Sequence, residues 1–150
     1  MNRFVIGMDG LAVKRLTAND CAFKDPKSKS HQIGFNLPHK SFKKMFHDLI
    51  SDDSTQVVVQ NFVVKWFDSD GQEIVELLQA VKFYHSKREL RMVDLNNAIL
   101  KEMFDVGSLL LFMRDGIDIS VTIFHAGSEN NLAEIHGADL IAKIPNRKSS

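Results

Sequence analysis

A run of β-branched and aromatic residues at positions 56–67, QVVVQNFVVKWF, most constrains what this chain can fold into. Such residues favour the pleated surface of a strand over a helix. Side chains of a strand point alternately to its two faces, so both faces of this segment are apolar. One face carries Val58, Phe62, Val64 and Trp66, and the other carries Val57, Val59 and Val63. Because both faces are apolar, we predict a long central strand that is covered on both sides.

Three Asp-Gly pairs predict where the chain reverses direction. They lie at positions 9–10, 70–71 and 115–116, each time between apolar stretches. A tight hairpin needs positive φ, which this pair adopts readily. We therefore predict three hairpins, the last of which joins SLLLFM at 108–113 to a strand with alternating Ile117, Ile119, Val121 and Ile123.

The remaining segments supply helices and further strands. After Pro38, apolar residues recur at helical spacing and predict an amphipathic helix over 40–51, through Phe42, Met45, Phe46, Leu49 and Ile50. A second helix is expected over 95–104. The segment 73–84 is read as the return strand of a hairpin, although its spacing also suits a helix. The segment 131–144 stays open between strand and helix, because Gly137 weakens a helix.

The length of 150 residues fits a single domain over 1–150. The pattern predicts an α+β fold, with a twisted antiparallel sheet of four or more strands and two or three helices packed on it. The strand at 56–67 is expected near the centre of the sheet, with the helix at 40–51 on one face.

The charge balance and the single cysteine narrow the choice of partners and of cellular compartment. Lys and Arg total 19, as do Asp and Glu, so no net field attracts a phosphate backbone, and we expect no nucleic-acid partner. No apolar run approaches the ~20 residues that cross a bilayer, so no membrane insertion is expected. Cys21 is the only cysteine and cannot close an intrachain disulfide, which favours a cytoplasmic location.

Signatures of catalysis and of cofactor binding are missing from the sequence. It contains no GxGxxG, P-loop, GxSxG or CxxC motif, so we expect neither a cofactor nor an enzyme. The six histidines do not pair at i, i+4, as a zinc site on a helix would need. The DSDG sequence fails as a calcium loop, because its register puts Trp66 at the first position and Leu77 at the twelfth. No metal site is predicted.

The apolar load of the chain is high, with eleven Phe, six Met and one Trp. Core packing and helix cover explain this load in one interpretation. In the other, an oligomer interface or a groove for apolar peptide segments explains it. The candidates for a peptide-binding surface are Phe23, Phe35, Phe62, Trp66 and Phe83, each of which could equally be a core residue.

The stretch LAVKRLTANDCAFKDP at 11–26 resembles the first strand of the SecB export-chaperone family. The matching residues are Arg15, Leu16, Asp20, Phe23 and Pro26, and a lysine stands at position 24, where the family favours an acid. The similarity continues through IGFNL at 33–37, the valine-rich strand at 56–67 and VELLQAVKFY at 75–84. The resemblance implies a chaperone that binds unfolded polypeptides without ATP and assembles as a dimer or a dimer of dimers.

Three classes of function follow. The first is an ATP-independent, chaperone-like protein that binds unfolded or extended polypeptides in protein export or toxin-antitoxin control, as a homo-oligomer. The alternative is a small cytoplasmic interaction module, such as an immunity or inhibitor protein that binds one folded partner. An enzyme on an α+β sheet is the third.

Overall fold

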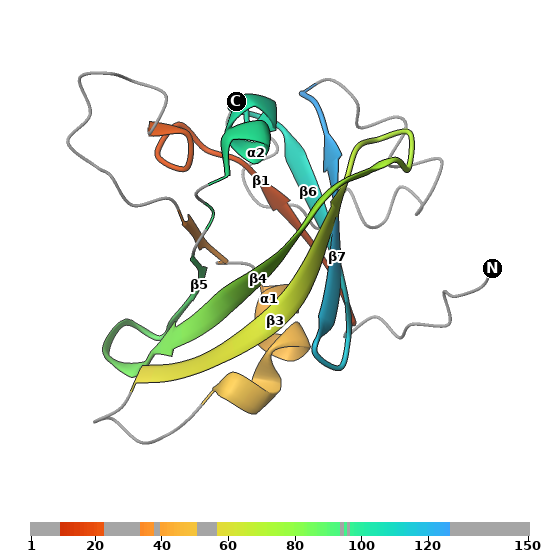
Figure 1. The fold of residues 1–150 in the computed structure, drawn as a ribbon. Helices are drawn as coiled ribbons and strands as arrows, with labels where there is room; N and C mark the ends of the chain where they lie inside the picture. The colour runs from red at the N-terminus through yellow and green to blue at the C-terminus, as the bar shows by residue number, and fades with distance from the viewer. Residues whose placement is uncertain are drawn as a thin grey trace.

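The computed structural model of this chain describes residues 10–22, 34–37, 40–50, 57–93, 95 and 97–126. These residues form a seven-stranded sheet in the order β1-β6-β7-β3-β4-β5-β2, which curls into a half-barrel (Figure 1). The strands are β1 (Leu11–Arg15), β2 (Phe35–Asn36), β3 (Val57–Phe67), β4 (Glu73–Tyr84), β5 (Glu89–Met92), β6 (Leu109–Asp115) and β7 (Asp118–Phe124).

Two long hairpins make up the centre of the sheet, and both turn at predicted Asp-Gly pairs. β3 and β4 pair antiparallel beside Gly71, which has a φ of 86°, and β6 and β7 pair antiparallel beside Gly116, which has a φ of 65°. Glycine adopts these positive φ values without steric cost. The two hairpins and the strand predicted over 73–84 are therefore confirmed, and Ile117 lies in the turn rather than in β7.

The two hairpins meet side by side in a parallel seam. β3 and β7 pair parallel, from Val63 opposite Asp118 to Phe67 opposite Thr122. The predicted fold class, an antiparallel sheet with two or three helices packed on it, is therefore wrong. The sheet is mixed, and the helices described are short. The sheet also has more strands than the four that the SecB resemblance suggests.

Two α-helices of six residues each occur in the described part of the chain, α1 (Lys40–Met45) and α2 (Ala98–Met103). The predicted helix over 40–51 is divided into α1 and the 3₁₀ turn η3 (His47–Leu49). Its apolar residues still face inward as the spacing predicts. Phe42 contacts Phe112 of β6, and Phe46 contacts Phe62 of β3, both edge to face, so this segment covers the concave side of the sheet.

The helix predicted over 95–104 is shorter than expected and begins after Asn97. The Asn97 side chain accepts hydrogen bonds from the backbone N–H groups of Ile99 and Leu100, a common way to begin a helix. Phe104, directly after α2, packs against Phe35 of β2. The end of α2 thereby lies next to the edge strand β2.

The main hydrophobic core lies inside the curl and draws residues from β1 to β7 and from both helices. A smaller buried cluster lies on the opposite face of the sheet, where alternation places every second residue of β1 and β6; it comprises Val13, Leu109, Leu111 and Phe124. Two predictions, the hairpin at positions 9–10 and the element over 131–144, concern segments outside the described residues.

Candidate protein-interaction surface

The aromatic side chains predicted for peptide binding lie in the core of this structure. Phe35, Phe62, Trp66 and Phe83 are completely buried, while Phe23 lies outside the described residues. For Phe62 and Trp66, the alternation of side chains along β3 explains this burial, because every second residue of β3 points to the concave side of the curled sheet. These four side chains do not form an exposed groove.

Trp66 illustrates how one of these candidates is held in the core. Its indole Nε1–H donates a hydrogen bond of 2.7 Å to the buried side-chain oxygen of Gln79. Its ring centroid lies 5.6 Å from that of Phe104. The polar tip of the tryptophan is thus satisfied inside the protein, and no surface position is needed to hydrate it.

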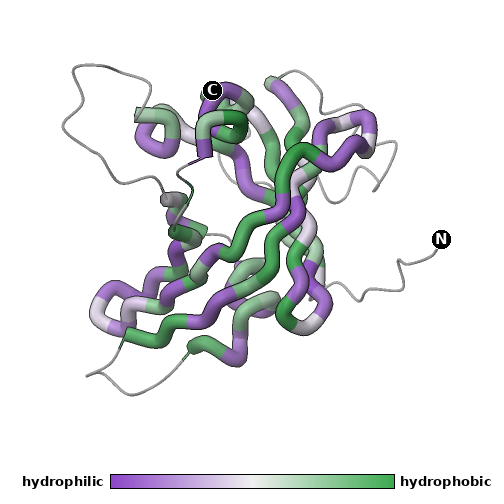
Figure 2. Tube along the Cα trace, in the orientation of Figure 1, coloured by the Kyte–Doolittle hydropathy of each residue, from purple (hydrophilic) through white to green (hydrophobic). Residues whose placement is uncertain are grey.

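Apolar side chains remain exposed on the outer, convex face of β3 and β4. Val57 and Val59 of β3 are 51% and 52% exposed, and Leu78 of β4 is 69% exposed. The half-buried Val63 lies directly opposite Leu78 in the β3–β4 register. We call these four residues the outer stripe. Figure 2 shows hydrophobic colour at the start of β3, where the valines lie.

The outer stripe differs from what the alternation predicted. Val57, Val59 and Val63 were placed correctly on the face opposite Trp66, but that face was expected to be covered. Leu78 was missed, because its position beside Val63 depends on the strand register. The signal that could have found it is the alternation of β4 together with the hairpin turn at 70–71.

The backbone beneath the outer stripe is paired on both sides for only part of its length. β3 pairs with β4 throughout but with β7 only from Val63 to Phe67, and β4 pairs with β5 only from Val81 to Tyr84. Both are internal strands of the sheet, and a partner that lies on this face contacts their side chains. The edges of the described sheet are β1 and the two-residue β2.

A hollow of about 400 Å³ adjoins the outer stripe where β3, β6 and β7 lie side by side. The strand registers put its principal lining residues on the same outer face; they are Val63, Lys65, Met113, Asp115, Asp118 and Ser120. Val63 belongs to both features. The outer stripe and the hollow therefore form one continuous surface of apolar and charged groups.

Arg114 also lines the hollow, but its guanidinium group is held by other parts of the protein. It makes a bidentate ion pair with Asp48 at 2.7 and 2.8 Å and donates a hydrogen bond to the Met45 carbonyl oxygen. It also lies over the rings of Phe46 and Phe62. The hydrogen bonds and charge of Arg114 lower the pKa of the Asp48 carboxyl group. Arg114 thus fastens the α1–η3 segment to the sheet.

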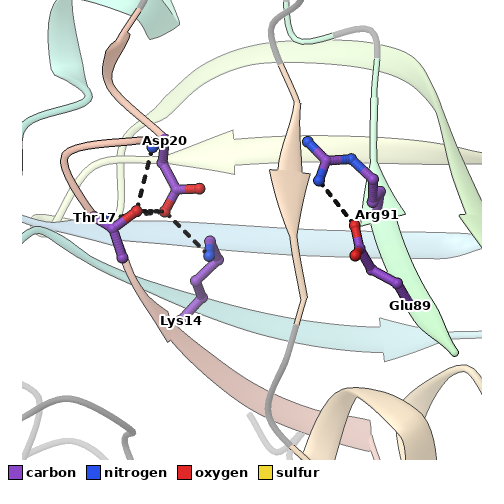
Figure 3. A network of polar contacts seen from close by, with 5 residues as sticks. All are labelled: Lys14, Thr17, Asp20, Glu89 and Arg91. Carbon is purple, nitrogen blue, oxygen red and sulfur yellow. Dashed lines mark hydrogen bonds and ion pairs between the residues drawn. The ribbon is translucent and has the colours of Figure 1, made fainter. Parts of the chain in front are cut away.

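A buried ion pair lies inside the stretch that resembles SecB (Figure 3). The Lys14 amine lies 3.1 Å from the Asp20 carboxylate, and both side chains are almost fully buried. The same carboxylate accepts hydrogen bonds from the backbone N–H and the hydroxyl of Thr17. Burial lowers the pKa of Lys14, and the charge of Asp20 partly offsets this effect.

Three of the residues that match the SecB pattern have structural roles here. Asp20 holds the turn after β1, and Leu16 lies in the main core. Arg15 donates a hydrogen bond to the Gly107 carbonyl oxygen. The nearby Cys21 is buried and forms no disulfide. On β5, Glu89 and Arg91 form a separate, partly exposed pair (Figure 3).

The turn between β4 and β5, at the lower left of Figure 1, carries several cations. Lys87 and Arg88 are exposed there, and Lys82 and Arg91 lie half-buried on the adjoining strands. Arg88 has a φ of 50° and lies over the ring of Phe83. This turn is thus a local region of positive charge in a chain that has no net charge.

The described ranges contain no group of three or more His, Cys, Asp or Glu side chains that could hold a metal ion. Within these ranges, no helix has the length and apolar character needed to cross a bilayer.

Comparisons with known proteins identify a distant structural similarity. No protein-family model and no curated protein matches the chain. Among solved structures, the chain is similar to the B3 domain of the UbaLAI restriction endonuclease, crystallised with cognate DNA. The sequence identity is 22% and the TM-score 0.47, over 85% of this chain and 77% of that chain. We withdraw the prediction that excluded nucleic acid as a partner.

Proposed function

We propose that this chain is a small protein-interaction module that binds one folded protein partner through the outer stripe. The observation that carries the proposal is the 69% exposure of Leu78 on an internal strand, on the same face of the sheet as the exposed Val57 and Val59. Burying one such side chain contributes about 1.5 to 3 kcal/mol. Apolar side chains grouped on one face, with polar groups at the rim, are typical of protein-binding surfaces.

A folded partner suits this surface better than an unfolded client. The surface is the face of a sheet formed by internal strands, and it carries few aromatic side chains. Binding of unfolded polypeptides stays a prediction, and the residues predicted for it that the structure describes lie in the core. Suppression of aggregation of an unfolded test protein is the assay that distinguishes the two functions.

The proposal treats the chain as a binding protein rather than an enzyme, because the hollow is open and its carboxylates are exposed. A cytoplasmic location is part of the proposal. Cys21 is the only cysteine of the chain and closes no intrachain disulfide, which supports a reducing compartment.

Site-specific photocrosslinking tests the outer stripe. With a photoreactive amino acid in place of Leu78, irradiation of cells that make the full chain should give one discrete protein adduct. Adding Val59→Asp should lower the yield of that adduct about tenfold or more, because a carboxylate buried at an interface without a partner is unfavourable. The measurement is the adduct band on a denaturing gel, identified by mass spectrometry.

Ile99 provides the matched control for this experiment. It is 54% exposed on α2, outside the outer stripe, so Ile99→Asp should leave the adduct from position 78 unchanged. A ladder of many adducts together with suppressed aggregation would favour the chaperone function. Equal loss of the adduct with Ile99→Asp and Val59→Asp would contradict binding through the outer stripe.

Nucleic-acid binding is the second candidate, favoured by the basic turn between β4 and β5. The turn and its adjoining strands carry one acidic residue, Glu89, which pairs with Arg91, and four cations, Lys82, Lys87, Arg88 and Arg91. Clustered lysine and arginine side chains can neutralise phosphates even when the net charge of a protein is zero.

Fluorescence anisotropy with a labelled DNA duplex at low salt tests this candidate. Lys87→Gln with Arg88→Gln should weaken binding and reduce its salt dependence by about two phosphate contacts. Lys43→Gln with Lys44→Gln removes the same charge from the exposed face of α1 and serves as the control. Equal weakening by both pairs would indicate attraction by overall charge and would exclude the turn as a specific contact.

A further inference from the structure

Resting on the proposed protein-binding function, we propose that the partner inserts an arginine or lysine side chain into the hollow between β3, β6 and β7. Its aliphatic part would pack on Val63 and Met113, and its charge would meet Asp115 and Asp118. Apolar side chains beside it would cover the outer stripe. The occupant is therefore a protein surface on which a basic residue adjoins apolar residues.

The charges of the hollow favour a cation over an anion. Lys65 lies 3.8 Å from Glu76, and the Arg114 guanidinium is held by its bidentate pair with Asp48. Both lining cations thus have acidic partners of their own. No ion pair to Asp115 or Asp118 occurs in the part of the chain that the structure describes, and both side chains are exposed. The hollow therefore presents two carboxylates to a partner.

The hairpin register places these two carboxylates together. Asp115 and Asp118 are directly opposite each other on β6 and β7, on either side of the turn at Gly116. Like charges in this position repel each other, and a cation between them relieves the repulsion. A guanidinium group can hydrogen-bond to carboxylates through several N–H donors at once.

The apolar floor of the hollow suits the rest of such a side chain. Val63 and Met113 lie on the same face as the carboxylates, and Met113 is only partly buried. The long stem of arginine or lysine packs readily on apolar groups while its charge stays at the rim. Methionine adjusts its shape to such a stem more easily than a branched residue. Since Val63 also faces Leu78, one partner surface reaches both features.

Chemical-shift titration of the ¹⁵N-labelled full chain tests this inference with defined peptides. The probes are the blocked tripeptide Leu-Arg-Leu and two variants with citrulline or glutamate in place of arginine. We expect the arginine peptide to shift the amides of Val63, Met113, Asp115 and Asp118. Citrulline keeps the shape but lacks the charge, and should bind about fivefold more weakly, as expected for two exposed ion pairs.

Matched protein variants complete the experiment. Asp115→Asn with Asp118→Asn should weaken binding of the arginine peptide about fivefold and leave the citrulline peptide unaffected. Glu73→Gln with Glu102→Gln removes the same charge at exposed positions elsewhere and should change neither affinity. Shifts confined to other surfaces, or equal affinities for arginine and citrulline, would overturn the inference. Those results leave the adduct from position 78 intact, so failure of this inference is distinguishable from failure of the proposed function.

Discussion

Replacing Trp66 with alanine is expected to lower the free energy of unfolding by about 3 to 5 kcal/mol. The indole is completely buried and packs against Phe104, so its removal leaves a cavity between β3 and α2. Its hydrogen bond to Gln79 is lost as well, which adds to the cost. A loss of this size is a large part of the stability of a typical domain. Urea denaturation followed by circular dichroism measures it.

Two variants separate the contributions to this loss. Trp66→Phe keeps an aromatic ring but removes the donor, so it should cost less than Trp66→Ala. Leu78→Ala shortens an exposed side chain of the same hairpin and should change stability by no more than about 0.5 kcal/mol. If Trp66→Ala left stability unchanged and weakened binding instead, Trp66 would belong to a binding surface, as the sequence alone suggested.

Replacing Asp20 with asparagine should cost about 3 to 5 kcal/mol, because it leaves the buried Lys14 charge without its ionic partner. The turn after β1 also loses acceptor strength at the oxygen that binds Thr17. Lys14 can escape the penalty only by losing its proton, so its pKa should fall further in this variant.

The pH dependence of the variant follows from the direction of that shift. A lysine with a lowered pKa in the folded protein binds fewer protons there than in the unfolded chain. Over the range between the lowered folded pKa and the ordinary value of 10.5, stability should therefore rise with pH. Below that range the full loss should persist. Urea denaturation of Asp20→Asn at several pH values checks the slope.

A double variant provides the control for the ion pair. Lys14→Met with Asp20→Asn removes both charges and keeps similar volumes, so it should recover much of the stability lost in Asp20→Asn alone. If the stability losses of Lys14→Met and Asp20→Asn simply added up in the double variant, the two charges would not stabilise each other.

Local signals in the sequence predicted much of the fold. Gly71 and Gly116 mark both central hairpins, and alternation put Trp66 and Val59 on opposite faces of β3. These features depend on φ preference and on the two-residue period of a strand, which a short segment already contains. Asn97 is likewise a local signal for the start of α2.

The parallel seam could not be predicted in the same way. It brings Val63 of β3 beside Asp118 of β7, two residues far apart in the sequence. No local pattern encodes such a pairing, and the antiparallel fold class was wrong for that reason. Only part of the candidate surface could be predicted, for a related reason. Val57 and Val59 could be assigned to one face, but whether another element covers that face is a long-range property.

The parallel seam also affects how the chain reaches its native state. Each central hairpin closes over a short turn, so β3–β4 and β6–β7 can form early and independently. Joining β3 to β7 requires closing the long connection that contains β4, β5, α2 and β6, which carries a larger entropic cost. Folding of this sheet is then the docking of two preformed hairpins, and the seam between them is the slow step.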